Sequence, residues 1–175
     1  MENIFGKNLA ELTELVLGLG LPKFRGKQLA EWLYKRSATD FQQMQNLSKD
    51  MRNKLAESYV IDRAARVDQL DSKDGKTSKF LLNFSDGSGV ETVLMRQPYG
   101  NSICVSSQVG CNMGCKFCAS TIGGKARDLT AGEILSQIFT ASKDLGVRIS
   151  NVIVMGMGEP LDNFDSVVRF LELVG

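Results

Sequence analysis

The chain has 175 residues, which is long enough for one or two domains with a buried core. Its 21 lysines and arginines nearly balance its 20 aspartates and glutamates, so bulk charge neither requires nor excludes a nucleic-acid partner. Histidine is absent, which excludes Cys–His nucleophile pairs and histidine-based acid–base catalysis. No apolar run reaches the roughly 18 residues of a membrane span, and the N-terminus is unlike a signal peptide. We therefore expect a protein of the reducing cytoplasm, with no membrane partner.

Helical periodicity dominates residues 1–60, which we predict to form a small helical accessory domain. Asn8 and Glu11 have the spacing of a capping box, so a first helix is expected to begin there. A second helix is predicted over residues 26–36, and a third after Ser48.

Five cations crowd one short part of this helical region: Lys23, Arg25, Lys27, Lys35 and Arg36. Taken alone, such a group favours the solvated face of an ordinary helix. A second interpretation, a patch that touches RNA phosphates, stays open.

Strand patterns replace helical ones over residues 61–98, which we interpret as a β-hairpin linker region. Residues 79–84 and 90–95 are rich in apolar and β-branched side chains and flank the Gly-containing segment 85–89. This arrangement predicts a β-hairpin. Pro98-Tyr99-Gly100 interrupts the second strand, so we place a boundary near residue 98.

Residues 99–175 alternate between strand and helix. The predicted elements are a buried strand over 103–107, a helix after the capping box of Thr130 and Glu133, a strand over 152–155 and a helix over 166–174. This order is the repeating unit of a parallel barrel, whose active sites lie at the carboxyl ends of the strands. Two such units cannot close a barrel, so we expect a truncated barrel and a parent protein about twice as long.

Three cysteines, Cys111, Cys115 and Cys118, have C-x3-C-x2-C spacing between the first of these strands and its helix. One short loop with three thiolates can wrap a single iron–sulfur cluster. Electron-transfer clusters normally have four cysteine ligands, so three would leave one iron open for chemistry. The alternatives are a zinc site that also uses Cys104, and structural disulfides. The spacing disfavours the first and the lack of a secretory segment the second.

A glycine-rich segment, Met155-Gly156-Met157-Gly158-Glu159-Pro160, follows the second predicted strand. Glycines allow a backbone to approach a ligand closely, and a carboxylate can bind an ammonium group. A lone Gly-x-Gly is usually a plain strand-to-helix turn. Its position one strand–helix unit after the cysteine loop favours a cofactor-binding loop instead.

These motifs together resemble the RlmN/Cfr family of radical S-adenosylmethionine (radical SAM) RNA methyltransferases. The similarity is carried by residues 105–120, 129–134 and 155–161, and it covers the N-terminal half of that family. It implies an α/β fold, in which a small N-terminal helical domain and a β-hairpin precede the first units of a partial radical SAM (β/α) barrel.

The resemblance also implies the cofactors, a 4Fe–4S cluster on the three cysteines and S-adenosyl-L-methionine on the open iron. Gly156, Gly158, Glu159 and Pro160 match the segment that binds the amino group of S-adenosylmethionine. Phe117 is expected near the adenine of that cofactor, with filling of the core beneath the cluster as the alternative.

Two catalytic residues follow from the resemblance alone. Cys104 matches the cysteine that resolves a protein–RNA adduct through a transient disulfide, and Glu91 matches the carboxylate that accepts a proton. Without the family match, Cys104 would be a small buried hydrophobe and Glu91 a solvated surface charge.

The family acts on an adenosine of 23S rRNA, and the resemblance to its carbon-2 members implies methylation of carbon 2 there and of an adenosine beside the anticodon of certain tRNAs. Carbon 2 lies between two electron-withdrawing nitrogens and is not nucleophilic, so a radical route is needed. The resemblance implies that one S-adenosylmethionine methylates a cysteine, and that a radical from a second takes hydrogen from that methyl group before carbon–carbon bond formation. The four cysteines of this chain all have other roles, so we expect the chain alone to be inactive. The implied partners are 23S rRNA, tRNA and an electron donor such as flavodoxin, and the implied state is a monomer.

Three alternatives remain at this stage. The carbon-8 resistance enzymes of the same family tend to have Glu-Ala where this chain has Glu159-Pro160, which favours carbon 2. An electron-carrying iron–sulfur module would need a fourth ligand and would not respond to S-adenosylmethionine. A non-catalytic RNA-binding protein would bind RNA without the three cysteines.

Overall fold

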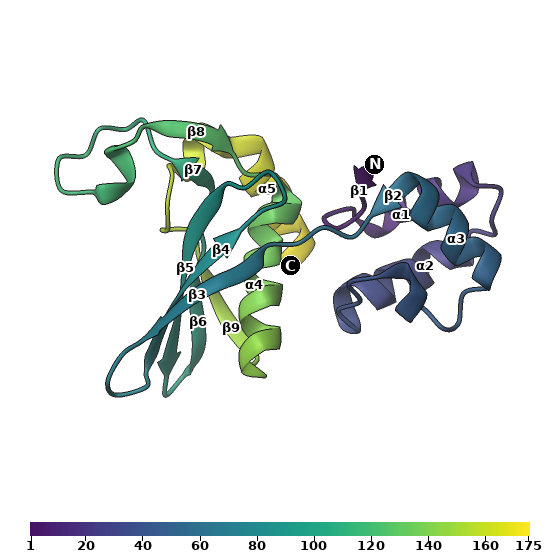
Figure 1. Cartoon of the computed structure of the whole chain (residues 1–175), viewed down its shortest axis with the longest axis horizontal. Helices are drawn as coiled ribbons and strands as arrows, with labels where there is room; N and C mark the ends of the chain where they lie inside the picture. Colours follow the sequence, from purple (N-terminus) through teal and green to yellow (C-terminus); the bar gives the residue numbers. More distant parts are fainter. The chain divides into compact units, whose positions relative to one another are not determined.

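The computed structural model describes residues 1–175 and divides into two compact units, Met1–Asp62 and Arg63–Gly175 (Figure 1). Helices and strands are both present, as the predicted α/β class requires. No helix combines the length and the apolar character that crossing a bilayer would need.

The first unit packs short helices around one apolar core. Its elements are β1 (Glu2–Asn3), α1 (Leu9–Gly18), α2 (Phe24–Ala30), the π-helix η1 (Glu31–Lys35), the 3-10 helix η2 (Phe41–Gln43), α3 (Lys49–Ser58) and β2 (Tyr59–Val60). β1 and β2 pair in parallel, which joins the beginning of this unit to its end. Leu12 of α1, Leu29 of α2 and Leu55 of α3 are completely buried in the shared core.

The predicted helix starts in this unit are confirmed at α1 and α3. The Asn8 side chain accepts a hydrogen bond from Glu11 N at 3.0 Å, and the Glu11 carboxylate accepts one from Asn8 N at 2.8 Å. Ser48 Oγ accepts from Met51 N at 3.3 Å and caps α3. The second helix begins at Phe24, earlier than predicted, directly after a turn in which Arg25 N donates to Pro22 O at 3.0 Å.

A five-stranded sheet organises the second unit, with the strand order β3-β4-β5-β6-β9. The strands are β3 (Ala65–Asp71), β4 (Thr77–Asn83), β5 (Gly89–Gln97), β6 (Gly100–Cys104) and β9 (Ile149–Ile153). Neighbours from β3 to β6 are antiparallel, whereas β6 and β9 are parallel. The predicted hairpin is β4–β5, and its strands share one sheet with the first strands of the β/α units.

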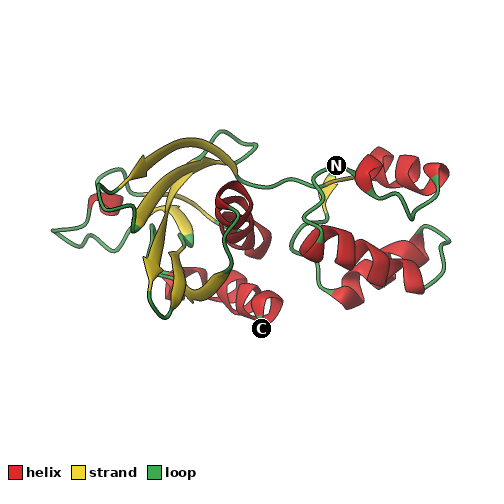
Figure 2. Ribbon diagram, turned by 90° about the horizontal axis from the view of Figure 1, so that it is seen from below, coloured by secondary structure: helices red, strands yellow, loops and turns green.

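One face of this sheet is covered by helix α4 (Ala131–Leu145). The apolar side chains that are fully buried on this face are Phe80, Leu82, Val90, Leu94 and Ile103. Thr92 Oγ1, on the same face, donates to Gln137 Oε1 of α4 at 2.7 Å. The predicted capping box of Thr130 and Glu133 starts α4, and α5 (Phe164–Val174) contacts α4. Figure 2 shows how strongly the sheet curves around these helices.

A second, small ladder was not predicted. β7 (Gln108–Gly110) and β8 (Lys125–Asp128) pair antiparallel and close the segment 111–124 into a loop that projects beyond the sheet (Figure 1, green). This loop contains the short 3-10 helix η3 (Ala119–Thr121), and another 3-10 helix, η4 (Pro160–Asn163), leads into α5. The three-residue β7 is too short to show strand periodicity in the sequence.

Candidate functional site

Two loops meet at the carboxyl ends of the parallel strands β6 and β9. Val105 N donates to Ile153 O at 2.9 Å, and Gly156 N donates to Val105 O at 3.0 Å. Farther along, Ser107 N donates to Met157 O at 2.9 Å. The segment that enters the cysteine loop therefore runs beside the glycine-rich loop, at the sheet edge where the sequence predicts an active site.

The three cysteines of the loop are free thiols: Cys111 is buried, Cys115 exposed and Cys118 half-buried. The loop is pinched at its base, since a Cβ on Gly110 would lie 1.9 Å from Gly124 O, and Cys111 N donates to that same oxygen at 3.2 Å. Within the loop, Cys118 N donates to Cys115 O at 3.0 Å.

No set of three Cys, His, Asp or Glu side chains in the structure is gathered closely enough to hold a metal ion. The structure therefore does not converge the three thiols on one point. Their chemistry nevertheless fits a cubic iron–sulfur cluster, because three unpaired thiols lie in one loop and no histidine competes for iron.

The glycine-rich loop packs directly on the end of β6 and the start of β7. A Cβ on Gly156 would lie 2.6 Å from Ser106 Oγ and 2.8 Å from Ser106 N. Gly158 has a φ of +98°, and its Cβ would lie 2.6 Å from Gln108 Cβ. The sequence associates these glycines with a bound ligand, whereas in the structure the surface that they approach is the chain itself.

Glu159 lies where this loop turns into η4. Its carboxylate accepts from Leu161 N at 3.0 Å and caps the helix, with Pro160 in the first turn. Its backbone N donates to Gln108 Oε1 at 2.8 Å. The Glu159 carboxylate is thus oriented by the hydrogen bond from Leu161 N. Because the residue is only half-buried, this carboxylate still reaches the surface.

A polar cluster joins β7, β8 and η4, and sequence reasoning missed it. Lys125 Nζ lies 2.7 Å from Asp162 Oδ2 and 3.3 Å from Asp128 Oδ1. Gln108 Nε2 donates to the same two atoms, at 2.8 Å and 2.7 Å respectively. The hydrogen bonds from Lys125 and then Gln108 lower the pKa of Asp162, and the Asp162 carboxylate raises the pKa of Lys125. The pairing of β7 with β8 and the approach of η4 bring these residues together, so no local pattern could reveal the cluster.

Cys104 and Glu91 lie on the same face of the sheet, opposite α4. Cys104 pairs with Val93 across the β5–β6 ladder and with Ile153 across β6–β9, and Glu91 is the next residue on that face of β5. Glu91 is exposed and forms an ion pair with Lys79 at 2.8 Å. Burial raises the pKa of the Cys104 thiol, and a backbone hydrogen bond at Met155 opposes that shift. Phe117, by contrast, is 96% exposed, so its ring fills no core in this structure.

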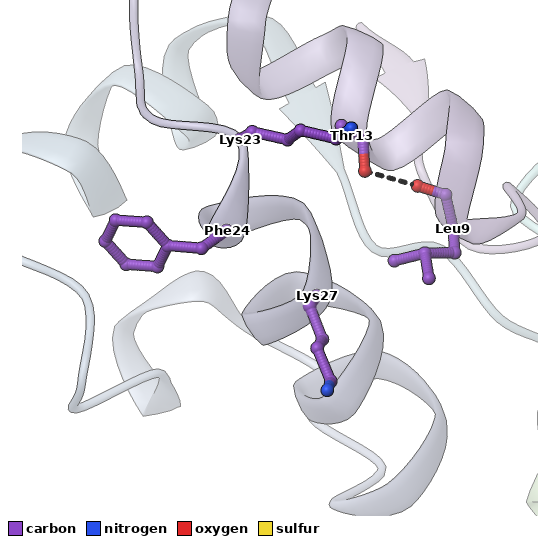
Figure 3. A pocket seen from close by; sticks show the side chains of 5 residues that line it. All are labelled: Leu9, Thr13, Lys23, Phe24 and Lys27. Carbon is purple, nitrogen blue, oxygen red and sulfur yellow. Dashed lines mark hydrogen bonds between the residues drawn. The ribbon is translucent and has the colours of Figure 1, made fainter.

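The predicted basic patch of the first unit separates into two kinds of contact. Lys23 and Lys27 line a shallow depression with Leu9, Thr13 and Phe24, and Figure 3 shows these five side chains. The two arginines of the patch stack on aromatic rings instead. Arg25 lies over Phe24 at 4.8 Å, and Arg36 lies over Trp32 at 4.7 Å. Phe24 itself is 55% exposed at the start of α2.

Comparison with known proteins defines the class first. Residues 105–175 match the radical SAM superfamily, and residues 2–61 match the ribosomal RNA large subunit methyltransferase N-terminal domain. The crystal structure of a radical SAM methyltransferase from Sphaerobacter thermophilus aligns with 99% of this chain and 52% of its own, with a TM-score of 0.91 and 36% sequence identity. The chain thus has a partial radical SAM fold, as predicted.

The particular family follows from sequence relatives. The chain is 51% identical over 174 residues to proteins of Clostridium acetobutylicum and Clostridium perfringens, each named "probable dual-specificity RNA methyltransferase RlmN". A Clostridium botulinum protein of that name is 49% identical. By both family models and by these relatives, the chain resembles the N-terminal half of RlmN-type radical SAM proteins. The match covers 99% of this chain and 50% of the first two relatives, so the chain spans about half their length.

Proposed function

We propose that the chain is the cluster- and cofactor-binding portion of an RNA methyltransferase that acts on carbon 2 of an adenosine, in 23S rRNA and in certain tRNAs, through a methyl-cysteine intermediate. The observation that supports this proposal is the side-by-side packing of the cysteine loop and the glycine-rich loop at the ends of β6 and β9. The relatives with whole-chain similarity are named RlmN, and none of the comparisons supports a carbon-8 enzyme or an electron-transfer module.

In this proposal Cys111, Cys115 and Cys118 would hold the 4Fe–4S cluster, which, when bound and reduced, would supply the electron that cleaves S-adenosyl-L-methionine. Glu159 receives the ammonium group of the cofactor, a charge-assisted contact that its half-buried carboxylate can make. The exposed ring of Phe117 packs on the adenine.

Gly156 and Gly158 hold the loop against the segment 105–108. Pro160 fixes the turn in which Glu159 lies, since its ring restricts the backbone at the start of η4.

Cys104 and Glu91 serve the later steps in this proposal, as the resolving thiol and the proton acceptor. Their common sheet face allows both to meet one RNA adduct. The raised pKa of Cys104 keeps its thiol protonated near neutral pH.

The methyl-carrying cysteine has no candidate among the four cysteines of this chain, and we therefore expect no turnover from the chain alone. A reductant such as flavodoxin would supply the electron. The first unit would contact RNA through Lys23, Phe24 and Lys27, because lysines neutralise phosphates and an exposed aromatic ring stacks on a base.

The proposal is tested by oxygen-free reconstitution of the chain with iron and sulfide, followed by iron analysis and electron paramagnetic resonance with and without S-adenosylmethionine. Wild type and Cys104→Ala are expected to hold a cluster whose spectrum changes when the cofactor is added. Cys111→Ala, Cys115→Ala and Cys118→Ala are expected to lose it. Loss of the cluster in Cys104→Ala, with no response to the cofactor, would instead indicate a four-cysteine electron carrier. For the full-length protein, mass spectrometry of rRNA from a rescued deletion strain should show a Cys104-dependent methyl gain.

A further inference from the structure

Gln108 has a buried side chain and is not among the residues proposed to bind the cluster or the cofactor or to act in catalysis. Its residue exposure is 0%, and its carboxamide makes three hydrogen bonds. Oε1 accepts from Glu159 N at 2.8 Å, and Nε2 donates to Asp128 at 2.7 Å and to Asp162 at 2.8 Å. A single side chain thus joins the base of the cysteine loop to the glycine-rich loop, β8 and η4.

The chemistry of the partners specifies glutamine. Glu159 N can only donate, whereas the two aspartates are acceptors when ionised, and Lys125 keeps them paired. A carboxylate at position 108 would face these two acids, and an aliphatic side chain would leave Glu159 N without an acceptor. Only an amide of this length satisfies both sides, so its orientation is fixed by its neighbours.

Packing reinforces this connection. Gly158 lies against the Gln108 stem, where any Cβ would come within 2.6 Å of Gln108 Cβ and 2.8 Å of its Cγ. Gln108 N also donates to Met157 O at 3.2 Å. The three residues from Met157 to Glu159 are therefore held by backbone, by side-chain amide and by van der Waals contact with one residue.

We propose that Gln108 is a positioning residue: it fixes the backbone of Glu159 relative to the cysteine loop, so that the Glu159 carboxylate is held where it can receive the ammonium group of S-adenosylmethionine. This inference rests on the proposed function for its ligand. Its mechanical part, the restraint of Glu159 by Gln108, does not depend on the ligand.

The structure offers a matched control in Gln137. This residue is also 0% exposed and also makes three hydrogen bonds, to Thr92 and to the backbone N and O of Ser106. None of these partners belongs to the glycine-rich loop. Replacing Gln137 therefore removes an equally buried amide and leaves the restraint on Glu159 intact.

The first experiment compares Gln108→Met and Gln137→Met in the reconstituted 175-residue chain by equilibrium dialysis with S-adenosylmethionine. Methionine keeps the length of the side chain and removes its hydrogen bonds. We expect Gln108→Met to bind the cofactor about 10-fold more weakly, as is typical when a residue that orients a ligand-binding group is lost, with unchanged iron per chain. Gln137→Met is expected to bind within about 2-fold of wild type, although it lowers the melting temperature similarly. Equal weakening in the two variants, or none in Gln108→Met, would overturn the proposal.

The second experiment measures hydrogen exchange at the Glu159 amide by NMR and needs no cofactor. Gln108→Met should accelerate exchange at Glu159, whereas Gln137→Met should not. A chain that bound no S-adenosylmethionine would count against the proposed function, and this exchange measurement would still decide the role of Gln108. Unchanged exchange at Glu159 in Gln108→Met would refute it.

Discussion

Gly158 and Gln108 are in direct contact, with the α-carbon of the glycine facing the stem of the glutamine so closely that a Cβ would lie 2.6 Å from Gln108 Cβ. The contact explains why the loop after β9 contains glycine even without a ligand. Because Gly158 also has a φ of +98°, a side chain there would be strained twice, by its backbone and by its neighbour.

Substitution of this glycine should therefore be costly. Gly158→Ala is expected to lower the free energy of unfolding by about 1–3 kcal/mol, as overpacking and a positive φ combine. Urea denaturation of the wild-type and variant chains measures this change. Gly123→Ala is the control, since a Cβ at Gly123 meets nothing within 4 Å. If Gly158→Ala unfolded at the same urea concentration as Gly123→Ala, Gly158 would not be closely packed against Gln108.

The hairpin turn contributes a pH-dependent stability. The hydroxyl of Ser88 and then the guanidinium of Arg127 lower the pKa of Asp86 to about 2. In the unfolded chain the pKa of an aspartate is ~3.9. The stabilisation by ionised Asp86 is therefore complete above about pH 4 and is lost as the pH falls towards 2. Asp86→Asn should thus be destabilised near neutral pH by at most ~1 kcal/mol, since the Asp86 side chain is 46% exposed.

Thermal unfolding of wild type and Asp86→Asn between about pH 2 and pH 7 checks this expectation, because the difference between them should vanish at the acid end. Glu172→Gln, a change on the exposed side of α5, is the control and should follow the wild-type curve. A difference that stayed constant down to the lowest pH would exclude an electrostatic origin.

The cysteines should differ in reactivity before any cluster is bound. Cys115 is exposed, whereas Cys104 is half-buried with a pKa raised by that burial. Thiolates are the reactive species, so iodoacetamide near neutral pH should modify Cys115 first and Cys104 at least about 10-fold more slowly. Mass spectrometry of tryptic peptides over time gives the two rates, and unfolding in urea should make them converge. Faster labelling of Cys104 would contradict its placement.

The depression on the first unit should bind single-stranded RNA by stacking and charge. Phe24→Leu retains an apolar side chain and should weaken binding of a labelled 12-nucleotide RNA by about 1–3 kcal/mol. Lys23→Gln together with Lys27→Gln should weaken binding and also reduce its salt dependence. Fluorescence anisotropy at several salt concentrations measures both effects. Lys49→Gln, at the start of α3, is the control. An effect of Lys49→Gln half as large as that of the double variant would mean that only net charge matters.

Local sequence determined the elements and the chemistry of this protein. Capping boxes at Asn8 and Thr130 start helices wherever they occur, because a side chain and a backbone N–H a few residues apart satisfy each other. The hairpin of β4 and β5 is equally local. The spacing of Cys111, Cys115 and Cys118 is a property of the primary sequence and does not depend on folding. It therefore indicated the class of protein before the fold was known.

Tertiary structure alone decided how the site is supported. Gln108 and Asp162 are 54 positions apart, and no sequence pattern in either segment predicts the hydrogen bond between them. The same holds for the face shared by Glu91 and Cys104, which depends on the register of β5 against β6. Such long-range contacts are determined by the burial of the whole sheet against its helices. They could therefore be identified only from the folded structure, not from local sequence patterns.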